Sequence, residues 1–273
     1  MAIRLIAMDL DGTVLREDQT IHPDLAGSFS RARDAGIQLA ICTGRAFQST
    51  KRIASAIDFS GPLVCSNGAH VINDEEEVIG AEFLPGDVQE WILEYADENS
   101  IHVSCYGENG VSTLRESEWL TKYKTLVRGL DIPILGMEAL KQKPLFKIVL
   151  ICSAEVLPIH REKFAFLVAE QRAQLTESGP EYLEILPVQA NKGNGLAKLA
   201  QYLRLDRSEI AAIGDYRNDL EMLSWVGTAG AVKNALPEVK SLAQFVVKSN
   251  EDGGVAEFID RCILLNSNIV SES

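Results

Sequence analysis

The segment Asp9-Leu10-Asp11-Gly12-Thr13 follows directly after the mainly apolar stretch Ile3-Arg4-Leu5-Ile6-Ala7-Met8. The run is typical of a short buried strand, and Gly12 allows the chain to turn tightly where that strand ends. Side chains two positions apart in an extended chain point the same way, so the carboxylates of Asp9 and Asp11 can face one site. In open α/β sheets, ligands bind at the carboxyl ends of the strands. The segment therefore indicates a functional edge, and a merely solvated acidic loop is the alternative interpretation.

Strands and helices alternate in the first and last parts of the chain, on both sides of a middle segment at about 84–187. Strands are predicted at 37–42, 63–65, 210–213 and 245–247, and helices at 23–36, 46–57, 191–203, after Arg217 and from about Gly254. A hairpin is predicted around the acidic turn between 70–72 and 78–79. Short links between such elements favour a parallel sheet with right-handed crossovers. We therefore predict an α/β fold with a doubly wound, Rossmann-like parallel-sheet core.

The middle of the chain has a different pattern. A helix begins at Pro85, and strand-like segments follow at 101–106, 111–115, 146–152 and 182–186, with helices near 116–127 and 155–173. Strands in pairs beside helices are typical of an α+β unit, and 273 residues exceed the usual size of one domain. We predict a catalytic core of residues 1–83 and 188–273 and an inserted α/β cap of residues 84–187 that selects the substrate.

Composition excludes several classes of protein. A net charge of −13 repels nucleic-acid phosphates, so no nucleic-acid partner is expected. No uncharged apolar run has the roughly 20 residues of a membrane span, and the N-terminus reaches charge too soon for a signal peptide. The five cysteines are odd in number and show no CxxC pairing, which favours buried thiols. We expect a cytoplasmic protein without membrane contact, as a monomer or small homo-oligomer.

Two further groups stand next to predicted helix starts. Thr43-Gly44-Arg45 follows a strand and offers a hydroxyl and a backbone N–H to a phosphate oxygen, although an ordinary N-cap followed by a solvated arginine explains this segment better when it is taken alone. Lys192 begins a helix, where the helix dipole prefers anions. A phosphate or carboxylate beside Lys192 would explain its place, and a surface lysine is the alternative.

The last group is Gly214-Asp215-Tyr216-Arg217-Asn218-Asp219, after the strand 210–213. Asp215 and Asp219 share a face on a helical turn, and a bound cation would relieve their repulsion. Helix capping by Asp215 is the alternative. Taken together, the four groups supply several carboxylates, a hydroxyl, an amide and one ammonium at one edge of a sheet. This set is typical of phosphoryl chemistry around Mg²⁺, which takes oxygen ligands and keeps waters and substrate phosphate.

In this order the four groups resemble the haloacid dehalogenase superfamily. The stretches Asn67-Gly68-Ala69 and Asn234-Ala235, with Ser249-Asn250-Glu251-Asp252-Gly253-Gly254, resemble its Cof-type phosphatases. The resemblance implies a Mg²⁺-dependent phosphatase, a phosphoric monoester hydrolase acting on a small phosphorylated metabolite such as a sugar phosphate. It also implies an aspartyl-phosphate intermediate.

The resemblance further implies a role for each site residue. Asp9 is the nucleophile, and Asp11 is the general acid and base. The carboxylates of Asp9 and Asp215 and the backbone carbonyl of Asp11 hold Mg²⁺, and Asp219 supports them. The phosphate-binding residues it implies are Leu10, Thr43, Gly44, Lys192 and Asn218.

Some features stay open. Val232-Lys233 replaces the Met-Gly usual in the subfamily, and we interpret this as a change in a loop near the site. Arg45 is unassigned, and the four histidines have no ligand-like spacing. A phosphomutase on the same fold and a phospho-accepting, receiver-like signalling module are the alternatives. A dinucleotide-dependent dehydrogenase is disfavoured because no G-x-G-x-x-G follows the first strand.

Overall fold

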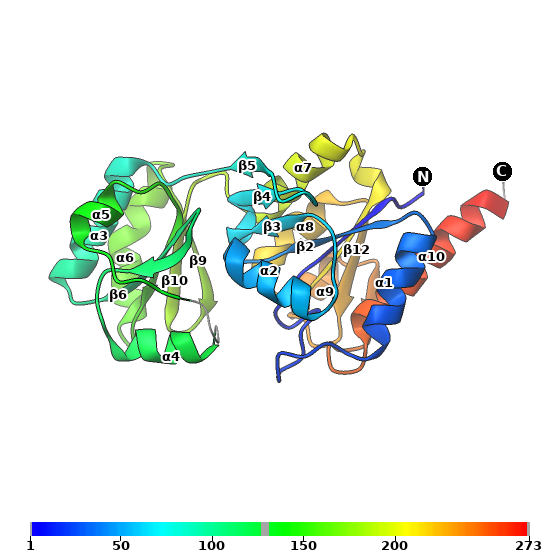
Figure 1. Cartoon of the computed structure of the whole chain (residues 1–273), viewed down its shortest axis with the longest axis horizontal. Helices are drawn as coiled ribbons and strands as arrows, with labels where there is room; N and C mark the ends of the chain where they lie inside the picture. Colours follow the sequence, from blue (N-terminus) through cyan, green and yellow to red (C-terminus); the bar gives the residue numbers. More distant parts are fainter. Residues whose placement is uncertain (1, 127–130, 272–273) are drawn as a thin grey trace. The chain divides into compact units, whose positions relative to one another are not determined.

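The computed structural model describes residues 2–126 and 131–271 and divides into two compact units (Figure 1). Unit 1 comprises Met1–Gly44, Thr50–Gly80 and Asn191–Ser273. Unit 2 comprises Arg45–Ser49 and Ala81–Ala190. That residues 84–187 act as a substrate-selecting cap stays a prediction.

Unit 1 is built on an eight-stranded sheet in the order β13-β12-β11-β1-β2-β3-β4-β5. Its strands are β1 (Leu5–Met8), β2 (Gln38–Cys42), β3 (Leu63–Cys65), β4 (His70–Ile72), β5 (Val78–Ala81), β11 (Ile210–Gly214), β12 (Thr228–Val232) and β13 (Phe245–Val247). Strand β1 pairs in parallel with both β2 and β11, and β4 pairs with β3 in antiparallel fashion. These findings confirm the predicted parallel-sheet fold class.

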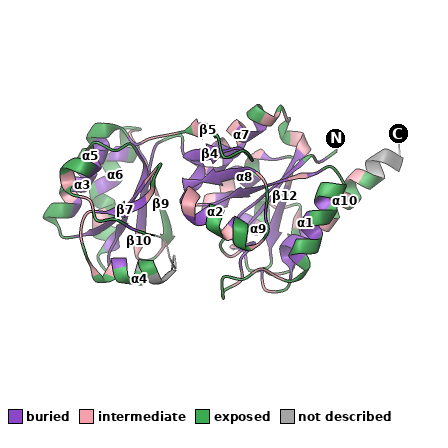
Figure 2. Ribbon diagram, viewed as in Figure 1, coloured by how far each residue is buried: buried purple, intermediate pink, exposed green. Residues whose placement is uncertain are grey.

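Helices cover this sheet in two groups. The helices of unit 1 are α1 (Asp24–Asp34), α7 (Lys192–Leu203), α8 (Leu220–Trp225), α9 (Pro237–Leu242) and α10 (Gly254–Ser271), together with α2 (Phe47–Ala56) from Thr50 onward. Helix α1 packs on α10, whereas α8 packs on α7 and α9. The sheet between them is buried along nearly every strand (Figure 2). Because the chain leaves β1 toward β2 but leaves β11 toward β12, right-handed crossovers place α1 and α8 on opposite faces.

Unit 2 contains a five-stranded antiparallel sheet in the order β7-β6-β8-β10-β9. Its elements are α3 (Gly86–Glu98), β6 (His102–Gly107), β7 (Gly110–Thr113), α4 (Glu118–Leu126), α5 (Met137–Lys141), β8 (Leu145–Ile151), α6 (Leu157–Ala169), β9 (Gln174–Gly179) and β10 (Tyr182–Leu186). One apolar cluster joins α3 and α6 to the sheet, and it includes Ile92, Phe164 and Ile148. The unit therefore has a hydrophobic core of its own.

The sequence missed four elements, α5, α9, β9 and β12. β9 is a half-exposed edge strand of polar residues, which gives no alternation of apolar side chains. β12 consists of small residues around Gly230, where a Cβ would lie 2.4 Å from the Phe258 ring. Position 127, the predicted end of the helix from 116, lies outside the described residues.

Candidate active site

Asp9 ends up buried because the chain continues the sheet for one residue beyond β1. The backbone N–H of Asp9 donates to the carbonyl of Ile213 at 3.1 Å, and Asp9 is 4% exposed. The loop then folds back, and the N–H of Val14 donates to the Asp9 carbonyl at 3.3 Å. The nucleophile candidate therefore stands on rigid backbone at the carboxyl end of the sheet.

Gly12 gives this loop its shape. Its φ is +79°, in the left-handed region that favours glycine, and a Cβ there would lie 2.5 Å from Oδ2 of Asp215. Thr13 is buried and donates its hydroxyl to Oδ1 of Asp215 at 2.9 Å. The loop after β1 therefore holds Asp215 in place directly.

Lys192 lies between two carboxylates. Its Nζ is 2.5 Å from Oδ1 of Asp9 and 2.6 Å from Oδ1 of Asp219, and its side chain is fully buried. Burial alone would lower the pKa of Lys192, but Asp219 and Asp9 outweigh it and raise the pKa. This contact explains why a lysine opens α7.

Tight packing between α7 and the segment after β3 brings Lys192 to this place. A Cβ at Gly68 would lie 2.0 Å from the Asn191 carbonyl oxygen, and one at Gly195 would lie 2.6 Å from the Gly68 Cα. The Asn191 side chain caps α7 by accepting from the N–H of Asn194 at 2.8 Å. Two glycines therefore set the approach of the helix start.

Asp219 uses both of its carboxylate oxygens within the protein. Oδ1 accepts from Lys192, and Oδ2 accepts from the backbone N–H groups of Asp215 at 2.9 Å and Tyr216 at 3.1 Å. Asp219 therefore orients Lys192 and the turn that carries Asp215.

Three carboxylates gather at this point. Each of Asp9, Asp215 and Asp219 has an oxygen within 4.8 Å of the others, among the residues that the structure describes. Burial raises the pKa of Asp9 well above its usual value, and it raises that of Asp215 to about 6, with repulsion from Asp219 adding to both shifts. Asp11 is exposed, and its carboxylate does not join the group.

This donor set fits a hard divalent cation. Three acids face a single lysine, so excess negative charge lies where little water reaches it. Carboxylate oxygens are the ligands that Mg²⁺ prefers, and Asp9 and Asp215 can supply them because Asp219 is already engaged.

The phosphate-binding candidates lie on neighbouring segments. Thr43 is buried and lies directly after β2. Its backbone N–H donates a hydrogen bond to the carbonyl of Val64 at 2.8 Å. A Cβ at Gly44 would lie 2.9 Å from Oδ1 of Asn67, and the same oxygen accepts from Nδ2 of Asn218 at 3.1 Å. Asn67 therefore links Gly44 to Asn218. Leu10 is fully buried in the loop after β1.

The sequence analysis assigned no structural role to Asn67, Asn234 and Asn250, which it named only within the stretches that resemble the family. In the structure Nδ2 of Asn234 donates to the Gly12 carbonyl at 2.7 Å, and its Oδ1 accepts from the N–H of Asn250 at 3.1 Å. Nδ2 of Asn250 donates to the carbonyl of Leu15 at 2.9 Å. Asn234 and Asn250 therefore hold the loop after β1. The signal available in the sequence was the Asn67-Gly68 and Asn234-Ala235 pairs and the stretch Ser249-Asn250-Glu251-Asp252.

The interpretation of Val232-Lys233 as a change in a loop near the site is only half right. Val232 is the buried last residue of β12, and only Lys233 lies in the following turn. Val232 therefore belongs to the core of the sheet, whereas its neighbour leads directly to Asn234.

A sequence profile of haloacid dehalogenase-like hydrolases matches residues 6–259. The chain belongs to this family. The match confirms the resemblance inferred from the sequence. Together with the phosphatases named next, it confirms the class of enzyme, a phosphoric monoester hydrolase.

Named relatives within the haloacid dehalogenase-like hydrolases are phosphatases. The chain is 30% identical over 288 residues to the 5-amino-6-(5-phospho-D-ribitylamino)uracil phosphatase YwtE of Bacillus subtilis, with 96% of this chain and 98% of the relative covered. It is 30% identical over 242 residues to an HMP-PP phosphatase of Shigella flexneri, with 87% of each covered. The crystal structure of TM0651 from Thermotoga maritima is similar, with a TM-score of 0.85, 27% identity and 95% and 97% coverage.

Proposed function

We propose that this family member is a Mg²⁺-dependent phosphatase that hydrolyses a small phosphorylated metabolite through an aspartyl-phosphate. The observation that carries the proposal is the group formed by buried Asp9, half-buried Asp215 and buried Lys192 at the carboxyl ends of the strands. Bound Mg²⁺ would neutralise the phosphoryl oxygens and the surrounding carboxylates.

In the first step a carboxylate oxygen of Asp9 attacks phosphorus, and the bond from phosphorus to the ester oxygen breaks. Asp11 gives its proton to the departing oxygen, so the leaving group departs as an alcohol. The exposure of Asp11 suits a group that exchanges protons with substrate and solvent. The product of this step is a phosphoryl group on Asp9.

In the second step Asp11 takes a proton from water, and the resulting hydroxide attacks phosphorus. The bond between Asp9 and phosphorus breaks, and inorganic phosphate leaves. Lys192, Thr43 and Asn218, with the N–H groups of Leu10 and Gly44, would balance charge on the transferring group. The net reaction converts a phosphomonoester and water into an alcohol and phosphate.

The relatives narrow the substrates that we propose. Their names specify a phosphorylated ribitylaminouracil in one case and HMP-PP in the other. We propose a small phosphorylated metabolite, with a sugar phosphate or one of these two compounds as candidates, and residues 84–187 as the part that selects among them.

We further propose that the protein works in the cytoplasm, which its five free, buried cysteines support. Within the described residues no helix has the length and apolar character to cross a bilayer.

A panel of phosphorylated metabolites assayed for phosphate release, with Mg²⁺ and with EDTA, tests the proposal. We expect many turnovers per enzyme for at least one compound and none with EDTA. A single stable phosphorylation would instead support a receiver-like module. Conversion of one sugar phosphate into its isomer without phosphate release would support a phosphomutase.

A further inference from the structure

A small pocket in unit 2 is lined by side chains that the proposed reaction does not use. It has a volume of about 70 Å³ and lies between the turn of the β6–β7 hairpin and the segment that leads into β8. That volume has room for a few waters or one small oxyanion. Its lining residues are Gly107, Glu108, Asn109, Gly110, Val111, Ser112, Pro133, Lys143, Pro144 and Leu145.

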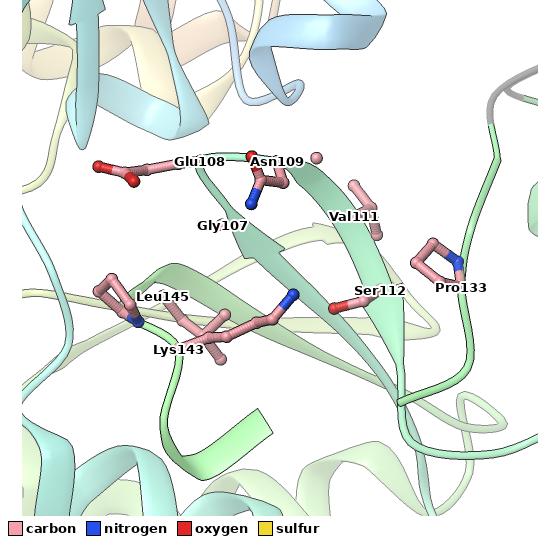
Figure 3. A pocket seen from close by; sticks show the side chains of 10 residues that line it. Gly107, Glu108, Asn109, Val111, Ser112, Pro133, Lys143 and Leu145 are labelled. Carbon is pink, nitrogen blue, oxygen red and sulfur yellow. The ribbon is translucent and has the colours of Figure 1, made fainter. Parts of the chain in front are cut away.

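Three polar side chains converge in this pocket. Figure 3 shows Asn109, Ser112 and Lys143 directed into the same space, whereas the carboxylate of Glu108 is turned away. Ser112 is 7% exposed, so its hydroxyl is held in the wall of the pocket. Across residues 2–126 and 131–271, the Lys143 ammonium forms no ion pair or hydrogen bond. One cation and two neutral polar groups therefore face a shared space.

The backbone of Lys143 is held firmly. Gln89 is 2% exposed and donates through Nε2 to the carbonyls of Leu140 and Lys143, both at 2.8 Å. The same group lies 3.4 Å from the carbonyl of Lys141. A buried amide thus fixes the turn after α5, and this turn sets where the Lys143 side chain starts.

A neighbouring lysine provides a contrast. Nζ of Lys141 binds Glu90 at 2.8 Å and Glu94 at 2.6 Å, so its charge is used within the protein. Lys143, two residues later, has no such ion pair within the described residues, so its ammonium can bind an anion. A positive charge beside a hydroxyl and an amide suits an oxyanion and disfavours a metal cation.

We propose that this pocket is an oxyanion-binding site for a phosphate or carboxylate group, held by Lys143 with Ser112 and Asn109. Two sources share this chemistry: a second anionic group on the substrate, and a separate free anion. The site is argued from unit 2 alone and stands whether or not the proposed function holds.

Inorganic phosphate is the probe that tests the site. We would titrate it into isotope-labelled full-length protein in EDTA and follow the backbone amide resonances of residues 107–112 by NMR. Saturable shifts are expected, and Lys143→Met should weaken phosphate binding about tenfold or more, as expected for a lost charge-assisted hydrogen bond. Lys163→Met is the matched control, because Lys163 is an exposed lysine of α6 outside the pocket, and it should bind as the wild type does.

Unresponsive amides at 107–112 in the wild type would overturn the proposal, as would equal phosphate affinity in Lys143→Met. KM values measured with fructose 6-phosphate and with fructose 1,6-bisphosphate distinguish the two possible sources of the anion, the substrate and a separate free anion. A KM increase in Lys143→Met for the bisphosphate alone assigns the pocket to the substrate's second anionic group. NMR-detected phosphate binding with both KM values unchanged assigns the pocket to a separate anion. Failure of the proposed function would appear as no turnover of any ester, with the NMR response intact.

Discussion

Nζ of Lys192 lies 2.5 Å from Oδ1 of Asp9 although 183 positions separate the two residues. The pair is buried, and Asp219 holds the lysine from its other side at 2.6 Å. A buried lysine between two carboxylates is expected to stabilise the fold, and under the proposed function it also binds the transferring phosphoryl group.

Replacing Lys192 with methionine tests both roles. Two buried carboxylates would lose their counter-charge, and we expect a loss of about 3–5 kcal/mol in the free energy of unfolding, together with loss of activity. Urea denaturation and phosphate release measure the two effects. Lys240→Met, at a half-exposed lysine of α9 outside the site, should change neither by much. Wild-type stability in the Lys192 variant would contradict the electrostatic account.

Asp9→Asn tests the nucleophile. An amide keeps the shape of the side chain but cannot form the acyl phosphate, so turnover should fall below detection while the protein stays folded. Circular dichroism checks the fold, and phosphate release checks the reaction. Activity close to that of the wild type would remove Asp9 from the mechanism.

Asp215→Ala tests the metal site. Removing one of two carboxylate ligands should shift the Mg²⁺ dependence of activity to concentrations at least about tenfold higher. The comparison is Asp206→Ala, an exposed helix cap that should lower stability slightly without changing the Mg²⁺ titration. An unaltered Mg²⁺ titration in Asp215→Ala would count against the assignment.

Gly12→Ala and Gly36→Ala form a matched pair, because both positions have φ above +70°. A Cβ at Gly36 meets nothing within 4 Å, so this variant should lose only about 1 kcal/mol of stability from backbone strain. A Cβ at Gly12 would lie 2.5 Å from Asp215 and should also abolish activity. Equal activity in both variants would show that the approach to Asp215 has no role.

The buried histidine His102 should make stability depend on pH. Burial lowers its pKa to about 4, while the unfolded chain keeps a value near 6.5. Between these values the unfolded state binds more protons, so the contribution of His102 weakens stability as pH falls from 6.5 toward 4. The carboxylates of Asp9 and Asp215, with raised pKa values, act in the opposite direction.

A comparison between wild type and His102→Gln isolates that contribution. The difference in unfolding free energy between the two proteins should change by about 1 kcal/mol per pH unit in this window and level off below it. Urea denaturation from pH 7 to pH 4 measures it. A difference that is constant with pH would mean that His102 titrates normally in the folded protein.

The sequence predicted those parts of the site that depend on local pattern. Asp9, Thr43 and Asp215 follow apolar strands, and Lys192 follows a helix cap, so each could be placed at one edge of a sheet. The roles of Thr13 and Asn234 could not be predicted, because each acts through one contact across the chain, with Asp215 and with the Gly12 carbonyl.

The fold, too, could be predicted only where a local sequence pattern determines the element. Strands with a continuous apolar run, such as β1 and β11, were predicted within one or two residues. β12 was missed because Gly230 is selected by the ring of Phe258 in a distant helix, and no local periodicity records that. Pairing partners such as Leu5 and Ile210 likewise follow from the assembled sheet.

That last pairing has a consequence for how the protein is made. β1 leaves the ribosome before unit 2, whereas its neighbour β11 follows some two hundred residues after β1, once the whole of unit 2 has been synthesised. A nascent chain halted before Asp215 and Asp219 has Asp9 without the second carboxylate that we propose for Mg²⁺ and without one of the two carboxylates that bind Lys192. The proposed site can therefore assemble only after the whole of unit 2 has been translated.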